Sequence, residues 1–84
     1  RIFGDYAIEV ALVERSLAIK ERAYGRDHVE VAPVLYSLGN VHHFLGDKAK
    51  AREYIARALA IFEPAYESDH PRTQMCRNYL ARLS

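Results

Sequence analysis

The residues of this chain that could do chemistry are four histidines and one cysteine. His42 and His43 are adjacent, and neighbouring residues on a helix point about 100° apart, so the pair cannot bind one metal ion together. Cys76 has no histidine at a useful helical spacing, and a free cysteine packs as a small apolar residue. The sequence also lacks a glycine-rich phosphate loop, a zinc-binding spacing and a nucleophile motif. We therefore expect no catalytic residue, no metal site and no cofactor, and we predict that the protein is not an enzyme.

The composition narrows the partners that the chain could have. Its 84 residues form one small domain at most, and its net charge of +1 gives no electrostatic footprint for nucleic acid or an anionic membrane. No apolar run approaches the roughly 18 residues of a membrane span, and no signal peptide opens the chain. A lone cysteine fits a reducing compartment, so we expect a cytoplasmic protein. Because Arg1 aligns with a position inside a later helix, we also expect a piece of a longer protein.

The sequence repeats itself after 42 residues. Sliding it by that distance aligns Gly4-Asp5 with Gly46-Asp47 and the segment Arg15–Ile19 with Arg57–Ile61. In total, 13 of the 42 aligned pairs are identical, far more than unrelated segments would share. A fixed period of this length is typical of a helical repeat array.

Apolar residues recur at spacings of 3, 4 and 7, which indicates helices rather than strands. We expect an all-α protein with four antiparallel helices at about residues 6–24, 29–45, 48–66 and 71–83, in a single unit that covers residues 1–84. In the first helix the buried stripe should contain the following residues: Ile8, Val10, Leu12, Val13, Leu17, Ile19 and Tyr24. In the second helix His42 falls on the packing stripe, so we expect a core position for it.

Capping residues predict where the helices begin. Asp5 and Asp47 should be N-caps, and Asp27 should form a capping box with Glu30. The two Asp-His pairs belong to a repeated turn, in which we expect the histidines, His28 and His70, to serve in capping.

Glycine and proline predict where the helices end. Gly25 and Gly46 are natural stops. Gly4 should likewise form a turn before the first helix. Pro64 removes one helical hydrogen bond, so a kink or an early end of the third helix is expected.

The second and third helices resemble the tetratricopeptide repeat. Leu35-x2-Leu38-Gly39-x2-His42, followed by Ala51-x3-Ile55, follows the pattern W-x2-L-G-x2-Y…A-x3-F. The small Gly39 and Ala51 would let paired helices approach closely. The 42-residue period, with Ala-Tyr and Asp-His before each first helix, is similar to the long repeats of kinesin light chains. This resemblance implies a short right-handed solenoid of about two repeats, acting as a non-catalytic scaffold for protein partners.

One polar face is the candidate binding site. Tyr36, Asn40 and His43 lie within about 60° of one another on the second helix, and Asn78 and Arg82 take the places of Tyr36 and Asn40 one repeat later. In the resembled family, such positions line a concave groove for an extended peptide. Arg82 and His43 favour an acidic segment or a C-terminal carboxylate. The alternative is that all five residues form an ordinary solvated helix face.

A second hypothesis for the whole chain is structural. Repeat arrays usually need about three repeats to bury a continuous core, and this chain holds about two. Its first and last helices each lack a neighbour. The segment would then associate with itself, or pack on flanking repeats, without binding a ligand of its own.

Overall fold

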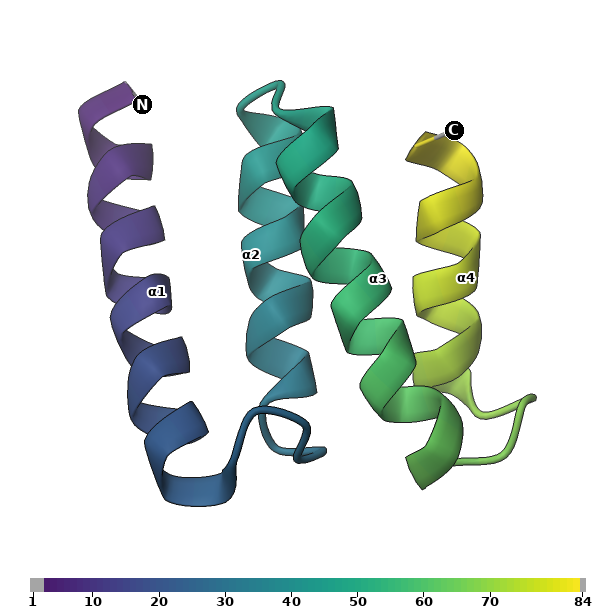
Figure 1. Cartoon of the computed structure of the whole chain (residues 1–84). Coiled ribbons are helices and arrows are strands. Elements are labelled where there is room, and N and C mark those ends of the chain that lie inside the picture. Colours follow the sequence, from purple (N-terminus) through teal and green to yellow (C-terminus); the bar gives the residue numbers. More distant parts are fainter. Residues whose placement is uncertain (1–2, 84) are drawn as a thin grey trace.

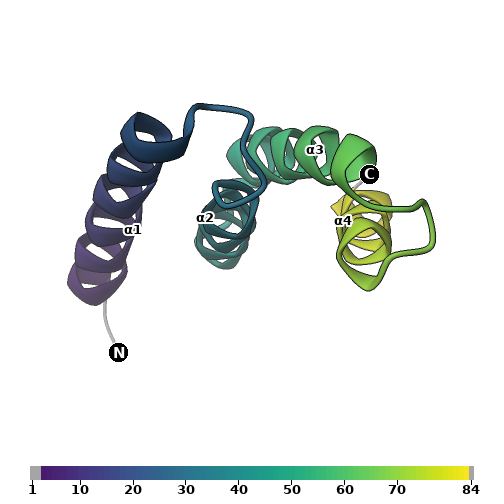
Figure 2. The same ribbon diagram turned by 90° about the horizontal axis from the view of Figure 1, so that it is seen from below.

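The computed structural model describes residues 3–83, and the side chains of residues 5–83. The described chain consists of four helices: α1 (Phe3–Tyr24), α2 (Ala32–Phe44), α3 (Lys48–Ala65) and α4 (Pro71–Leu83). Consecutive helices run antiparallel and pack side by side (Figure 1). Seen from below, α2 and α4 lie on the same side of α3, and α1 stands beyond α2 (Figure 2). The predicted all-α stack of helical hairpins is confirmed.

The first helix begins earlier than the expected residue 6. It starts at Phe3, so Gly4 does not form a turn and Asp5 lies inside the first helical turn instead of capping it. An acidic side chain there still interacts favourably with the positive end of the helix dipole. At the other end, Gly25 adopts a φ of 95°, a left-handed conformation that glycine adopts without steric cost, and its N–H donates to the Glu21 carbonyl.

The expected capping box before α2 is wrong. Val31 is the N-cap, and no side chain caps the helix. Instead, Nδ1 of His28 accepts the Glu30 N–H at 3.0 Å, and the Val31 N–H donates to the His28 carbonyl. These turns use the residues that were expected to form the first helical turn, so α2 begins at Ala32 rather than at residue 29.

The ends of α3 agree better with the sequence pattern. Oδ1 of Asp47 accepts the Lys50 N–H at 3.1 Å, which confirms the predicted N-cap. Gly46, with a φ of 88°, makes the preceding turn, and α2 itself ends at Phe44, one residue early. Pro64 lies in the last turn of α3, which ends at Ala65 before an extended residue, Tyr66.

The same corner follows both α1 and α3. Tyr24 stacks on His28 with ring centroids 4.9 Å apart, and Tyr66 stacks on His70 at 4.0 Å. Each histidine also accepts a backbone N–H two residues ahead, and for His70 that donor is Arg72 in the first turn of α4. The predicted capping role is confirmed for His70, but it is wrong for His28, because Glu30 lies before α2 begins.

The core lies among α2, α3 and α4, with one contribution from α1. Its buried apolar residues are Leu17, Val31, Ala32, Leu35, Leu38, Ala51, Ile55, Ala58, Ile61, Phe62, Cys76, Tyr79 and Leu83. Gly39 sits where α2 and α3 approach most closely, since a Cβ there would meet Cδ1 of Ile55 at 2.5 Å and the Ala51 carbonyl oxygen at 3.3 Å. The predicted role of this small residue in close packing is confirmed.

Two predicted core assignments need correction. On α1 the side chains of Ile8, Leu12, Ile19 and Tyr24 are half or more exposed, because in the described structure the helix packs on α2 with its opposite side only. His42 is half-buried rather than fully buried, and its ring stacks on Tyr54 at 5.5 Å.

Candidate functional site

Three of the five predicted site residues meet around one tyrosine, Tyr79 on α4. Its hydroxyl forms a 2.8 Å hydrogen bond with Nδ1 of His43 on α2. Tyr36 contacts the Tyr79 ring edge-on, with centroids 5.5 Å apart. The Arg82 guanidinium lies 5.0 Å from the centroid of the same ring, within cation–π range. We call these four residues the Tyr79 cluster.

Helix geometry explains why the cluster forms. Tyr36 and His43 are seven residues apart, so they lie about 20° from each other on α2. Tyr79 and Arg82 are three residues apart and are neighbours on α4. Because α2 and α4 lie on the same side of α3 (Figure 2), the two pairs face each other across the repeat boundary.

Burial raises the pKa of both phenols of the cluster, which are neutral at pH 7 in any case. It is the main cause that raises the pKa of Tyr36, with smaller contributions from Cys76 and Tyr79, while Arg82 acts in the opposite direction. Burial also raises the pKa of Tyr79, again opposed by Arg82. At neutral pH the cluster therefore offers hydroxyl groups and a guanidinium, which are hydrogen-bond donors for an acceptor such as a carboxylate.

The two asparagines of the predicted site make none of the ring or hydrogen-bond contacts that define this cluster. Asn40 is exposed on α2 and borders an open depression of about 290 Å³, lined also by Tyr6, Glu9, Val41 and Phe44, which faces α1. Asn78 is exposed on α4, one residue before Tyr79. The structure thus brings together Tyr36, His43 and Arg82 and places Asn40 at the depression toward α1. Asn78 is a helical neighbour of Arg82, four residues away on α4.

Tyr79 itself lies on the apolar stripe of α4, together with the buried Cys76 and Leu83. Only 4% of the residue is exposed, but its hydroxyl reaches across to α2. The available signal was the i, i+3 spacing of Tyr79 and Arg82, which puts an aromatic ring beneath a cation on one helix face.

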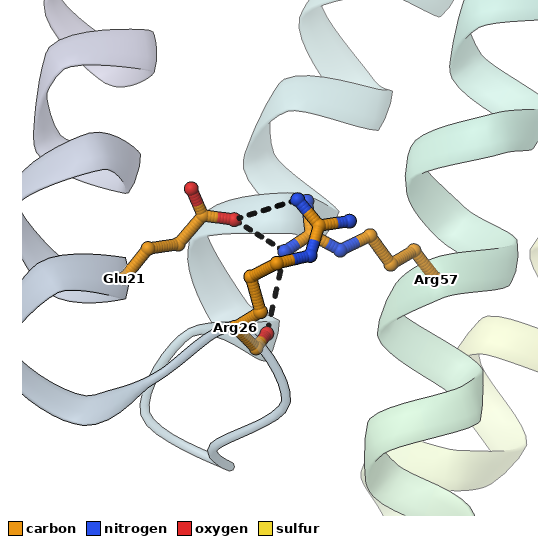
Figure 3. Close-up of polar contacts among 3 residues, drawn as sticks. All are labelled: Glu21, Arg26 and Arg57. Carbon is orange, nitrogen blue, oxygen red and sulfur yellow. Dashed lines mark hydrogen bonds and ion pairs between the residues drawn. The ribbon is translucent and has the colours of Figure 1, made fainter.

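Sequence reasoning also missed a charged contact between α1 and α3. The Arg57 guanidinium donates to the Glu21 carboxylate and, at 3.3 Å, to the Arg26 carbonyl (Figure 3). The Arg26 side chain approaches the same Glu21 carboxylate at 3.8 Å. Glu21 and Arg57 are each less than a quarter exposed, so this contact, the Glu21–Arg57 clamp, fastens the end of α1 to the second repeat.

Other chemistry has little support among the described residues. No group of three or more His, Cys, Asp or Glu side chains in residues 3–83 could hold a metal ion. Burial raises the pKa of Cys76 to about 11, which leaves this thiol protonated and unreactive at neutral pH. None of the helices in the described part of the chain is long and apolar enough to cross a membrane.

Paired antiparallel helices that repeat every 42 residues, with an exposed polar and aromatic face, define an α-helical repeat protein of the scaffold class. A comparison with protein families matches residues 3–63 to the tetratricopeptide repeat. The chain therefore belongs to the tetratricopeptide repeat family, whose members are generally non-catalytic scaffolds for protein–protein interaction. No curated protein matches the chain. The kinesin light chain type of repeat stays a prediction.

Proposed function

We propose that the chain binds an extended, acidic peptide along the face shared by α2 and α4. The contacts would come from Tyr36, Asn40, His43, Asn78 and Arg82, with Tyr79 at the centre. The observation that supports this proposal most strongly is the Tyr79 cluster, because it joins the two helices that would form one peptide groove.

The chemistry of these side chains suits such a ligand. Arg82 is exposed and lies over an aromatic ring, a position that leaves its N–H groups able to donate to a carboxylate. The amides of Asn40 and Asn78 can each donate to and accept from the backbone of an extended peptide. Tyrosine and arginine are also the residue types most often found at energetic hot spots of protein interfaces.

The test uses labelled ten-residue peptides of acidic, neutral and basic composition, with free or amidated C-termini, and measures fluorescence anisotropy. We expect the acidic peptides to bind most tightly. Replacing Asn40 and Arg82 together by alanine should weaken their binding roughly tenfold or more, the size expected for one interface hot spot. Helical circular dichroism should not change, because both side chains are exposed.

The matched control is Arg22→Ala, which removes an exposed arginine from α1, away from the Tyr79 cluster. It should leave the peptide affinity unchanged. Equal affinities for the double variant and the wild type would contradict the proposal, as would a set of acidic peptides that bind no better than basic ones.

A structural role is the second candidate, and a different observation favours it. Ile8, Leu12 and Ile19 on α1 form an exposed apolar stripe, each residue about 60% exposed. Such a stripe on a helical repeat is a surface on which a further helix can pack. The chain would then act mainly by assembling with other repeats.

A further inference from the structure

Each residue of the Glu21–Arg57 clamp has a repeat counterpart of the same type elsewhere in the chain. The 42-residue shift that relates the two repeats carries Arg15 onto Arg57 and Glu21 onto Glu63, and the residue types are identical. Arg15 on α1 and Glu63 on α3 are both exposed. They are therefore the two halves of a second clamp, located at opposite ends of the stack.

Glu63 and Glu21 share one kind of contact, although Glu63 is the more exposed of the two. Glu21 contacts Arg26, which follows it in the chain, as well as Arg57 of the next repeat. Glu63 likewise contacts an arginine that follows it, with Arg77 Nη2 2.9 Å from its carboxylate. A carboxylate can accept from two guanidinium groups at once, so Glu63 retains capacity for an arginine of a neighbouring molecule.

The apolar surfaces agree with the same arrangement. One 42-residue shift carries α2 onto α4, and two such shifts carry α1 to the position after α4. An α1 helix of a second copy would therefore lie beside α4 in the way that α3 lies beside α2 within one chain. Leu12 and Ile19 would then turn toward α4, where Leu80 is half-buried. Ile8 would stay exposed, as its repeat counterpart Lys50 is. Ile61, the repeat counterpart of Ile19, is only 4% exposed, which shows how far such packing buries this position.

The closest packing position changes in size between the repeats. Within the chain, Gly39 faces Ile55, and a Cβ on Gly39 would meet Cδ1 and Cγ1 of that isoleucine at 2.5 and 2.7 Å. The corresponding pair between copies is Ala81 and Val13. Val13 lacks a Cδ1 atom but keeps a Cγ1, so α1 of a second copy must lie slightly farther from α4 than α3 lies from α2.

We propose that α1 of one molecule docks on α3 and α4 of a second copy of this chain, head to tail, with Arg15 of the first bound to Glu63 of the second. This contact is heterologous, because the two copies use different surfaces, so it can continue into open chains of molecules. It uses the outer sides of α1 and α4 and leaves the Tyr79 cluster between α2 and α4 unoccupied.

The test is a charge exchange read by sedimentation velocity across a concentration series. Wild-type protein should form species larger than a monomer as its concentration rises. Arg15→Glu alone and Glu63→Arg alone should each weaken association roughly tenfold or more, because like charges then meet across the interface. An equimolar mixture of the two variants should associate again, since each contact then joins opposite charges.

Two surface charge reversals serve as controls. Glu53→Arg on α3 and Lys48→Glu at the start of that helix alter exposed residues outside the proposed contact. They should leave association unchanged, and circular dichroism should show that all variants are folded. A wild-type protein that stays monomeric would overturn the proposal. The proposal would also be overturned if the single variants associate as strongly as the wild type, or if their mixture does not associate. Either result would fit a symmetric dimer through α1, which does not pair residue 15 with residue 63.

Discussion

Identical residues in the two repeats have different surroundings. Ile19 on α1 is 59% exposed, and its counterpart 42 residues later, Ile61 on α3, is 4% exposed. The two helices share the sequence Leu-Ala-Ile at this point, so local sequence does not account for the difference. The neighbours do: α3 packs against both α2 and α4, while α1 packs on α2 along one side (Figure 1). In a repeat protein the burial of a residue depends on its position in the stack.

α1 is held to the rest of the molecule by fewer buried contacts than α3. The described contacts of α1 include an aromatic pair near its start, Tyr6 with Phe44, and the Glu21–Arg57 clamp near its end. Leu17 is its only fully buried residue among residues 5–24. An element with few buried apolar contacts opens at a lower free energy than the core, so α1 should be the least stable of the four helices.

The largest expected effect comes from shortening the two equivalent isoleucines. Ile61→Ala should reduce the free energy of unfolding by about 2–4 kcal/mol, because it leaves a cavity in the core. Ile19→Ala should change it by less than about 0.5 kcal/mol, as is usual for an exposed position. Urea denaturation followed by circular dichroism, at a concentration where the protein is monomeric, measures both values. Similar losses for the two variants would show that α1 is packed on both sides in solution.

A smaller effect is expected from the clamp. Glu21→Gln should lower the free energy of opening of α1 by about 1–2 kcal/mol, because the charged Arg57 then faces a neutral amide instead of a carboxylate. Amide hydrogen exchange should show faster exchange in α1 and unchanged protection in α3. Glu14→Gln, an exposed site on the same helix, is the control and should change neither. Equal acceleration in both helices would mean that they open together.

Much of the fold could be predicted from local rules. Several features depend only on the repeat pattern or on residues close together in sequence. They are the 42-residue period, the left-handed backbone conformation of Gly25 and Gly46, the Asp47 cap and the close helix approach at Gly39. The repeat count predicted that α1 lacks a neighbour, but not which of its apolar residues are exposed, because periodicity identifies an apolar stripe without identifying what covers it. The late start of α2 was missed because His28, which is not a usual capping residue, accepts the Glu30 amide.

Less of the candidate site could be predicted. Angles around a single helix correctly grouped Tyr36 with His43, and the repeat shift brought in Arg82. They could not show how α2 and α4 are rotated relative to each other, and that rotation determines that Tyr79 joins the group while Asn40 faces α1. The Glu21–Arg57 clamp links residues 36 positions apart, a distance at which no local rule applies.

The smallest expected effect concerns Thr73 and its counterpart in the first repeat, Val31. Both are fully buried, but Oγ1 of Thr73 has no hydrogen-bond partner among the described residues. Thr73→Val should therefore raise the free energy of unfolding by about 1 kcal/mol, since it removes an unsatisfied buried hydroxyl and keeps the shape of the side chain. Thr73→Ser, which keeps the hydroxyl and removes the methyl group, should lower the free energy by about 1 kcal/mol. If the valine variant melts below the wild type, the hydroxyl has a hydrogen-bond partner in the folded protein in solution, which would contradict the prediction.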